Sequence, residues 1–254
     1  MLVEQVARGR QQVVTARIVE SLPVLRRRVM LTGLVLLALA VILTAVVAVS
    51  SIRSGVQGVD NWWNRLMIDI RWAPLVDVSK WLSTLFGTAV DWPVRIAITV
   101  VIALRRHWLA LGAWAVTVAV SELCIGPIKI FIDRPRPTGS LIATSGTSYP
   151  SGHAIASAVT AIGIVMALTS GRRRLHWMIA AVIIAAAVAL SRTYLSAHWL
   201  TDVLGGSLIG AGLALTIPEA FELTRDRLSR GSVIEDPATS AAADTSSGTS
   251  ESGT

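Results

Sequence analysis

Two histidines and one aspartate in the second half of the chain have the residue types that nucleophilic and acid–base chemistry needs. His198 and Asp202 are four residues apart, so they share one face if this stretch is helical. A carboxylate that holds one ring nitrogen of a histidine fixes the tautomer and raises the basicity of the other nitrogen, as a nucleophile requires. His153 lies in a separate segment. The sequence therefore allows one histidine to attack the substrate while the other protonates the leaving oxygen.

Three cations and a helix start accompany these residues and indicate an anionic substrate. Lys129, Arg136 and Arg192 lie at the ends of apolar blocks, where an unpaired cation is costly and an anion is its natural partner. The planar fork of arginine suits phosphate oxygens. Ser151 precedes an apolar run, as a helix N-cap does. Gly152 leaves its backbone N–H unobstructed at this helix start, the kind of place where phosphate binds.

Six apolar blocks must position these residues. The chain of 254 residues is 53% hydrophobic, which is more than is usual for a soluble domain, and the blocks are long enough to cross a bilayer. We therefore expect an all-α, polytopic membrane protein with a bundle of six transmembrane helices. A signal peptide is the alternative for the first block, but its apolar part would normally be shorter. The expected spans cover about residues 29–50, 82–104, 108–128, 151–170, 175–191 and 199–217.

Polar segments flank and interrupt the apolar blocks. Residues 1–28 are polar and basic and are expected to form a cytoplasmic N-terminal segment, followed by the membrane domain at 29–230. Residues 231–254 are rich in Ser, Thr, Ala and Gly, which predicts a disordered cytoplasmic tail. The mixed segment at 51–79 contains a Trp-rich stretch at 62–72, which favours an interfacial position; a lid that admits lipid is the alternative.

The basic residues predict the orientation in the membrane. The formal net charge is +7, but the basic residues cluster between apolar blocks, so no nucleic-acid partner is expected. The N-terminus, the turns at 105–106 and 172–174 and the start of the tail hold 14 of the 23 Lys and Arg residues. With six spans these segments share one side, which we expect to be cytoplasmic together with both termini. The segments that carry His153 and His198 would then face outward from the plasma membrane.

Three motifs occur in order along the chain: K-x6-R-P at 129–137, P-S-G-H at 150–153 and S-R-x5-H-x3-D at 191–202. With these motifs the chain resembles the type 2 phosphatidic acid phosphatase family, which shares its catalytic core with vanadium haloperoxidases. The resemblance covers about residues 80–217, and the six-span layout is similar to the membrane branch of the family. Each motif alone is weak, but the three together on one face are specific.

The resemblance implies a role for each motif residue. His198 would be the nucleophile that becomes a phosphohistidine, Asp202 its orienting partner and His153 the general acid. The family uses no metal and the sequence shows no cluster with metal-ligand spacing, so neither a metal nor a cofactor is expected. The motif spacing selects Arg136 over Arg134, which would either assist or only pair with Asp133. The residues that would hold the phosphate are Lys129, Arg136, Ser151, Gly152 and Arg192.

The expected function is that of an enzyme, a membrane phosphatase acting on a lipid phosphomonoester or diphosphate. The candidate substrates are phosphatidic acid, phosphatidylglycerol phosphate and a polyprenyl diphosphate such as undecaprenyl diphosphate. The expectation that the site faces outward slightly favours the polyprenyl diphosphate. One alternative is a phosphotransferase that passes the phosphate to an alcohol. Another is a non-catalytic transporter of lipid phosphates, which would not need the paired His and Asp. The expected partners are the membrane and the lipid substrate, and no protein partner is evident.

Overall fold

The computed structural model describes residues 2–234 and consists there of α-helices, turns and loops. No strand occurs in this range, and the all-α prediction is confirmed. The expected tail at 231–254 lies outside the described residues, except that α8 reaches Ile234. The helices are α1 (Leu2–Ala48), α2 (Ser50–Asp69), α3 (Ala73–Leu85), α4 (Thr88–Leu104), α5 (Trp108–Ile132), α6 (Gly152–Leu168), α7 (Gly171–Tyr194) and α8 (Leu200–Ile234).

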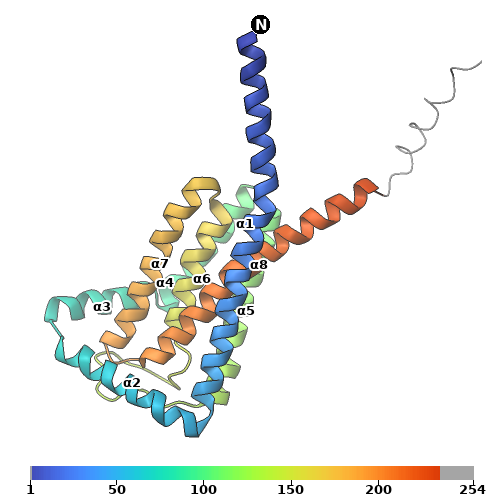
Figure 1. Ribbon diagram of the computed structural model, residues 1–254. Helices are drawn as coiled ribbons and strands as arrows, with labels where there is room; N and C mark the ends of the chain where they lie inside the picture. The colour runs from blue at the N-terminus through green and yellow to red at the C-terminus, as the bar shows by residue number, and fades with distance from the viewer. Residues whose placement is uncertain (1, 235–254) are drawn as a thin grey trace, which may run out of the picture.

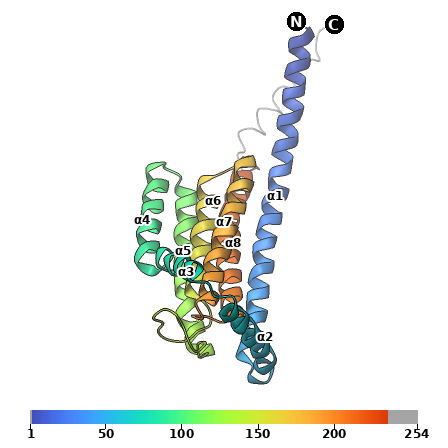
Figure 2. The same cartoon turned by 90° about the vertical axis from the view of Figure 1, so that its left-hand side faces the viewer.

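Most of the helices lie side by side in a bundle, and two helices lie obliquely near one end of it. In Figures 1 and 2, α4 to α8 stand side by side, and α1 runs along the bundle and continues beyond it toward the N-terminus. α2 lies across the opposite end of the bundle, and α3 follows it obliquely. The loop between α5 and α6 lies at this same end as α2.

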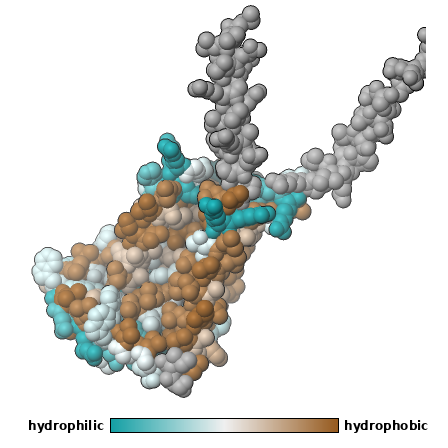
Figure 3. Space-filling view, viewed as in Figure 1, coloured by the Kyte–Doolittle hydropathy of each residue, from teal (hydrophilic) through white to brown (hydrophobic). Residues whose placement is uncertain are grey.

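The chain is a multi-pass membrane protein. Among the described helices, four segments are long and apolar enough to cross a membrane, namely Val24–Ala48, Trp108–Ile132, Gly171–Tyr194 and Leu200–Ser229. α3 and α4 pass the same test only as a pair, and α6 is apolar but has 17 residues. Apolar side chains cover much of the flank of the bundle that Figure 3 displays. The expected number of six spans therefore stays a prediction.

The block expected as one span at 82–104 is divided between α3 and α4, which meet at an angle of 50°. Gly87 lies at the N-cap of α4 with extended backbone angles, φ −76° and ψ 160°, so one helix cannot run through the corner. A Cβ atom on Gly87 would lie 3.7 Å from Nε2 of His153. The corner between α3 and α4 thus abuts one of the candidate catalytic residues.

α6 is the central helix of the bundle. Ile155, Val159 and Ile162 are almost fully buried. The first two pack with apolar residues of α1 and α8, and the third packs with residues of α7 and α8. In a bilayer, close van der Waals packing of such side chains contributes to holding the helices together. The packing fixes the N-terminus of α6, where the second motif begins.

α6 and α8 come into close contact at two glycines of α8. A Cβ atom on Gly206 would lie 2.6 Å from the carbonyl oxygen of Ser151, and one on Gly210 would lie 2.6 Å from that of Ile155. Carbon and oxygen atoms do not approach this closely without a bond, so these positions require glycine. Small residues at helix contacts permit such packing in membranes. The contact holds the start of α6 against α8 and thereby holds two of the motifs together.

Replacing Gly210 with alanine should destabilise the bundle by about 1–3 kcal/mol, because the new methyl group must displace the backbone of α6. The measurement is the thermal unfolding midpoint of the purified protein in detergent. Gly126→Ala in α5 is the matched control, since a Cβ atom there meets nothing within 4 Å and alanine favours a helix by about 1 kcal/mol. Equal midpoints for the two variants would contradict the close contact.

Candidate active site

Two connections bring the three motifs together at one end of the bundle. The loop at 133–151 joins α5 to α6, and the turn at 195–199 joins α7 to α8. The backbone N–H of Ser151 donates a hydrogen bond of 3.0 Å to the carbonyl oxygen of Asp202. This bond links the start of α6 directly to the first turn of α8, so the second and third motifs are neighbours.

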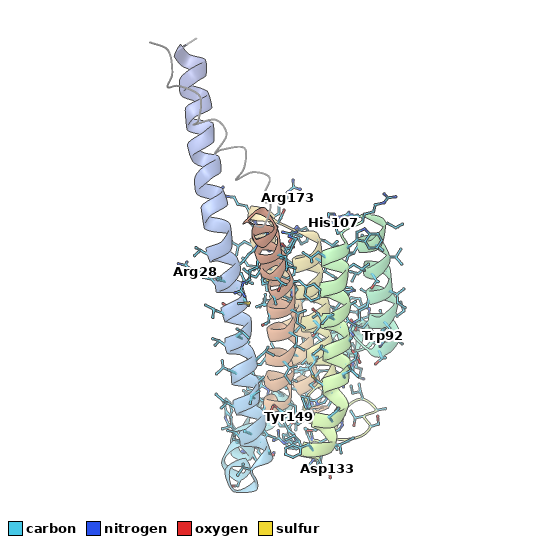
Figure 4. The ribbon with its side chains drawn as sticks, turned by 90° about the vertical axis from the view of Figure 1, so that its right-hand side faces the viewer. Arg28, Trp92, His107, Asp133, Tyr149 and Arg173 are labelled. Carbon is cyan, nitrogen blue, oxygen red and sulfur yellow. The ribbon has the colours of Figure 1, made fainter. Side chains whose placement is uncertain are left out.

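The motifs and the basic turns lie at opposite ends of the molecule. Figure 4 shows Asp133 and Tyr149, which flank the α5–α6 loop, at one end of the bundle. His107 and Arg173, which belong to the two basic turns, lie at the other end. The arrangement agrees with the alternation that the sequence predicts for successive helices.

His198 and Asp202 form a buried pair at the start of α8. The Nδ1 atom of His198 lies 3.5 Å from Oδ2 of Asp202. The same carboxylate oxygen accepts hydrogen bonds from Oγ of Ser148 at 2.6 Å and from the backbone N–H of Trp199 at 2.8 Å. The two predicted partners are 3% and 0% exposed, respectively. Their ring and carboxylate are therefore shielded from solvent and held by the surrounding protein.

The contacts of His198 define its tautomer. Its Nε2 atom lies 3.1 Å from Nη1 of Arg136. A guanidinium can only donate, so Nε2 must accept, and the neutral ring then carries its proton on Nδ1 toward Asp202. The Nε2 lone pair is consequently directed at a cation of the first motif. A nucleophilic histidine needs this arrangement, with the nitrogen beside the carboxylate protonated and the other nitrogen unprotonated.

His153 has the opposite tautomer. Its Nε2 atom lies 3.1 Å from the carbonyl oxygen of Ser83 in α3. A carbonyl only accepts, so Nε2 of His153 carries a proton and donates it. The neutral ring of His153 then has its lone pair on Nδ1. Because Nε2 is engaged by Ser83, Nδ1 is the nitrogen that would carry the proton of a general acid.

Burial keeps His198 neutral. Desolvation lowers the pKa of His198 to about 4, although the hydrogen bond and the charge of Asp202 act in the opposite direction, and Arg136 and Arg192 lower it further. Burial disfavours the charged form of a base, so the imidazolium forms only in acid. At neutral pH the Nε2 lone pair is therefore available.

The three predicted phosphate-binding cations have no carboxylate partner within the described part of the chain. Nζ of Lys129 donates to the carbonyl oxygen of Thr147 at 2.7 Å. Arg136 donates to backbone carbonyls, including that of Ala197 at 2.8 Å. Nη1 of Arg192 donates to Oγ of Ser83. Their positive charges are positioned by neutral acceptors, which leaves the charge to be balanced by an anion.

Ser151 occupies the N-cap position of α6, but its side chain does not act as a cap. Its Oγ atom is buried and has no hydrogen-bond partner in the range 2–234. Gly152 opens the helix, and the first N–H groups of a helix have no partner within the helix itself. A buried hydroxyl without a partner is costly, so a ligand at the helix start would satisfy it.

Sequence reasoning did not single out Ser83, Ser148 or Asp60 for this site, and it left the role of Arg134 open. Ser83 contacts both His153 and Arg192 from α3, and no motif marks it. Arg134 does not pair with Asp133 as one alternative held. Instead, Arg134 bonds Asp202 at 2.8 Å and Asp60 of α2 at 2.6 Å, although 74 positions separate Asp60 from Arg134. No local signal links positions so distant.

A metal ion would need a group of at least three ligating side chains. Among the side chains that the structure describes, at 24–49 and 54–229, no three His, Cys, Asp or Glu residues are grouped so as to hold a metal ion. The expectation that the chemistry needs no metal stays a prediction.

Comparison with known proteins finds a superfamily to which part of the chain is similar. Residues 110–225 match the model of the PAP2 superfamily, the type 2 phosphatidic acid phosphatases. Over this stretch the chain is similar to that superfamily. The crystal structure of a transmembrane PAP2-type phosphatidylglycerolphosphate phosphatase from Bacillus subtilis has a similar fold. Its TM-score is 0.68 at 25% identity, covering 77% of this chain and 98% of that one.

Three curated proteins to which this chain is similar are lipid phosphatases by name. Phosphatidylglycerophosphatase B from Bacillus subtilis is 40% identical over 90 residues, covering 33% of this chain and 44% of that protein. Decaprenylphosphoryl-5-phosphoribose phosphatase from Mycolicibacterium smegmatis is 36% identical over 109 residues, covering 41% and 54%. Undecaprenyl-diphosphatase from Sulfolobus acidocaldarius is 29% identical over 130 residues, covering 48% and 60%. The matched stretches span about half the length of these relatives.

In a pH titration followed by NMR of ring-labelled histidine, His198 should stay neutral from pH 8 to pH 5 and gain its proton only near pH 4. The sign follows from burial, which disfavours the imidazolium. Asp202→Asn removes the charge that favours the imidazolium and should lower the midpoint further. A midpoint near the ordinary value of about 6.5 would contradict a buried, neutral His198.

Proposed function

We propose that the protein is a member of the PAP2 superfamily and a membrane lipid phosphate phosphatase that works through a phosphohistidine on His198. The observation that carries the proposal is the orientation of His198, with Nδ1 beside Asp202 and the lone pair of Nε2 directed at Arg136. The cations Lys129, Arg136 and Arg192 lack carboxylate partners in the described chain and supply charge for a phosphate. The match to the PAP2 superfamily model and the names of the relatives support the same activity.

The proposed reaction has two steps. First, Nε2 of His198 attacks phosphorus, the bond to the leaving oxygen breaks, and His153, protonated beside the bound anion, gives that oxygen a proton. Asp202 stabilises the ring of His198 as it becomes positive. Second, a water molecule attacks the phosphohistidine, the now neutral His153 takes a proton from the water, and the N–P bond breaks to release phosphate and regenerate His198. Arg136 and Arg192 stabilise the negative charge on the phosphoryl oxygens in both steps.

The substrate class is the second part of the proposal. The candidate site lies at the end of apolar helices, so a lipid tail can stay in the bilayer while the phosphate enters the site. The relatives act by name on phosphatidylglycerophosphate, decaprenylphosphoryl-5-phosphoribose and undecaprenyl diphosphate. Two of these three are polyprenyl lipids, and the sidedness argument also favours a polyprenyl diphosphate. A phosphotransferase is distinguished by transfer of the phosphate to an added alcohol rather than to water.

The proposed location is the plasma membrane, with both termini in the cytoplasm and the site facing outward. The basic turns at 105–106 and 172–174 are the basis, because short basic segments favour the cytoplasmic side. His107 and Arg173 lie at the end opposite to Tyr149 in Figure 4, in support of this assignment.

His198→Ala should abolish hydrolysis of lipid phosphates, because no other group is available for the covalent step. The measurement is phosphate release by purified protein in excess EDTA, together with trapping of 32P-labelled protein in acid-quenched reactions. His153→Ala should be slowed most with poor leaving groups and should still form the labelled intermediate with good ones. Hydrolysis by His198→Ala at a near-normal rate would refute the mechanism, and a strict need for a divalent ion would count against the metal-free reaction.

One variant tests both the side of the membrane on which the site lies and the class of its substrate. Ser145 is exposed in the α5–α6 loop, so Ser145→Cys in a Cys124→Ala background should react with a membrane-impermeant maleimide in intact cells. The same protein should hydrolyse undecaprenyl diphosphate or phosphatidic acid at least about 100-fold more efficiently than glucose 6-phosphate, because remote binding energy of the tail contributes to catalysis. Failure of the Ser145→Cys protein to react in intact cells, or preference for the soluble ester, would overturn the respective proposal.

A further inference from the structure

A buried network behind the nucleophile reaches from α8 to the oblique helix α2. Asp60 of α2 is 0% exposed. Its Oδ1 accepts the backbone N–H of Thr201 at 2.9 Å, and its Oδ2 accepts the Thr201 hydroxyl at 2.7 Å and Nη2 of Arg134 at 2.6 Å. None of the three motifs contains Asp60. A carboxylate removed from solvent this completely needs a specific compensating partner.

Arg134 is that partner, and it connects two carboxylates. Its Nη2 atom binds Asp60, while its Nη1 atom donates to Oδ1 of Asp202 at 2.8 Å. Arg134 is 1% exposed, and its guanidinium lies over the ring of Trp199 at 5.6 Å from the ring centroid. Gln57 of α2 accepts from Nη2 at 2.7 Å. The guanidinium is therefore held at Nη1, at Nη2 and on the face that lies over Trp199. Arginine suits such a buried position because its planar group offers several donors in fixed directions.

The two oxygens of Asp202 consequently have different tasks. Oδ1 faces Arg134, while Oδ2 faces His198, Ser148 and the backbone N–H of Trp199. With Oδ1 held, the carboxylate cannot rotate about its bond without losing a buried charge-assisted contact. Oδ2 is thereby kept toward Nδ1 of His198.

We propose that Asp60 and Arg134 are positioning residues for the His198–Asp202 pair, so that α2 forms part of the catalytic machinery. Arg134 fixes the orientation of Asp202. Asp60 fixes Arg134 and balances its charge, so that Asp202 keeps enough negative charge to stabilise the ring of His198 during attack. The catalytic part of this inference rests on the proposed phosphatase function; the coupling between the charges does not.

The charges around His198 set the sign of the expected effects. The charged and titratable groups that face it are Asp202 from α8, Arg136 from the α5–α6 loop, Arg192 from α7 and His153 from α6. Arg134 lies behind Asp202 and adds a positive charge, and Asp60 offsets it. Removal of the positive charge should favour the imidazolium, so Arg134→Gln should raise the titration midpoint of His198 by about half a pH unit or more.

The kinetic test is a double-mutant cycle between Asp60 and Asp202. Asp60→Asn should lower kcat by about 10- to 100-fold, as loss of outer partners of metal-binding histidines does, with less than about a twofold change in KM. If Asp60 acts through Asp202, the same substitution in an Asp202→Asn background should cost less than about twofold, because coupled sites are not additive. Asp69→Asn, at an exposed position on the same helix, is the matched control and should leave kcat unchanged.

A merely structural role gives a different pattern. It predicts equal losses of kcat in both backgrounds and no rise in the His198 midpoint in Arg134→Gln; either of these results overturns the positioning role. If Asp60→Asn does not fold, the test uses the double variant Asp60→Asn/Arg134→Gln, which removes both buried charges. This variant should show the same loss of kcat, and adding Asp202→Asn to it should cost less than about twofold more. The NMR titration of His198 needs no turnover. A rise in the midpoint in a protein that hydrolyses no lipid phosphate would therefore reject the phosphatase function and retain the coupling.

Discussion

A single buried carboxylate connects most of the features that matter in this molecule. Asp202 is fully buried at the start of α8, where an uncompensated charge would be prohibitively costly. Four groups compensate it: Arg134 on one oxygen, and Ser148, the N–H of Trp199 and His198 on the other. The α5–α6 loop supplies Arg134 and Ser148, so this loop must pack against α8 for the carboxylate to remain charged. The same requirement brings the three motifs to one place.

The corner between α3 and α4 is the second element that the site depends on. Ser83 accepts the Nε2 proton of His153 on its carbonyl and a guanidinium N–H of Arg192 on its hydroxyl. While Nε2 of His153 is engaged in this way, a leaving oxygen must take its proton from Nδ1 of the imidazolium, or the contact with Ser83 must be given up. The 50° bend at Gly87 allows the end of α3 to meet α6 and α7 at this point. A straight helix through this segment would carry Ser83 past the site.

The opposite end of the bundle is held by ion pairs of the basic residues that sequence reasoning treated as orientation signals. Arg26 of α1 pairs with Asp226 at 2.7 Å and with Glu222 at 3.1 Å, both in α8. Arg174 of α7 lies 3.5 Å from Glu219, which also belongs to α8. Partly exposed pairs of this kind contribute little each, but they join α1, α7 and α8 at one end. The same residues thus serve topology and helix packing.

The sequence by itself determined the helical class, the apolar segments and the motif residues, because each depends on features within a few turns of chain: length of an apolar run, spacing of His198 and Asp202, or a serine before a helix. It did not determine the broken helix at 82–104, the role of Arg134, or the participation of Ser83 and Asp60. Those depend on contacts between positions that are remote in sequence, as between α2 and the α5–α6 loop. A buried charge selects its partner by what packing places within about 3 Å, and only the tertiary structure decides that.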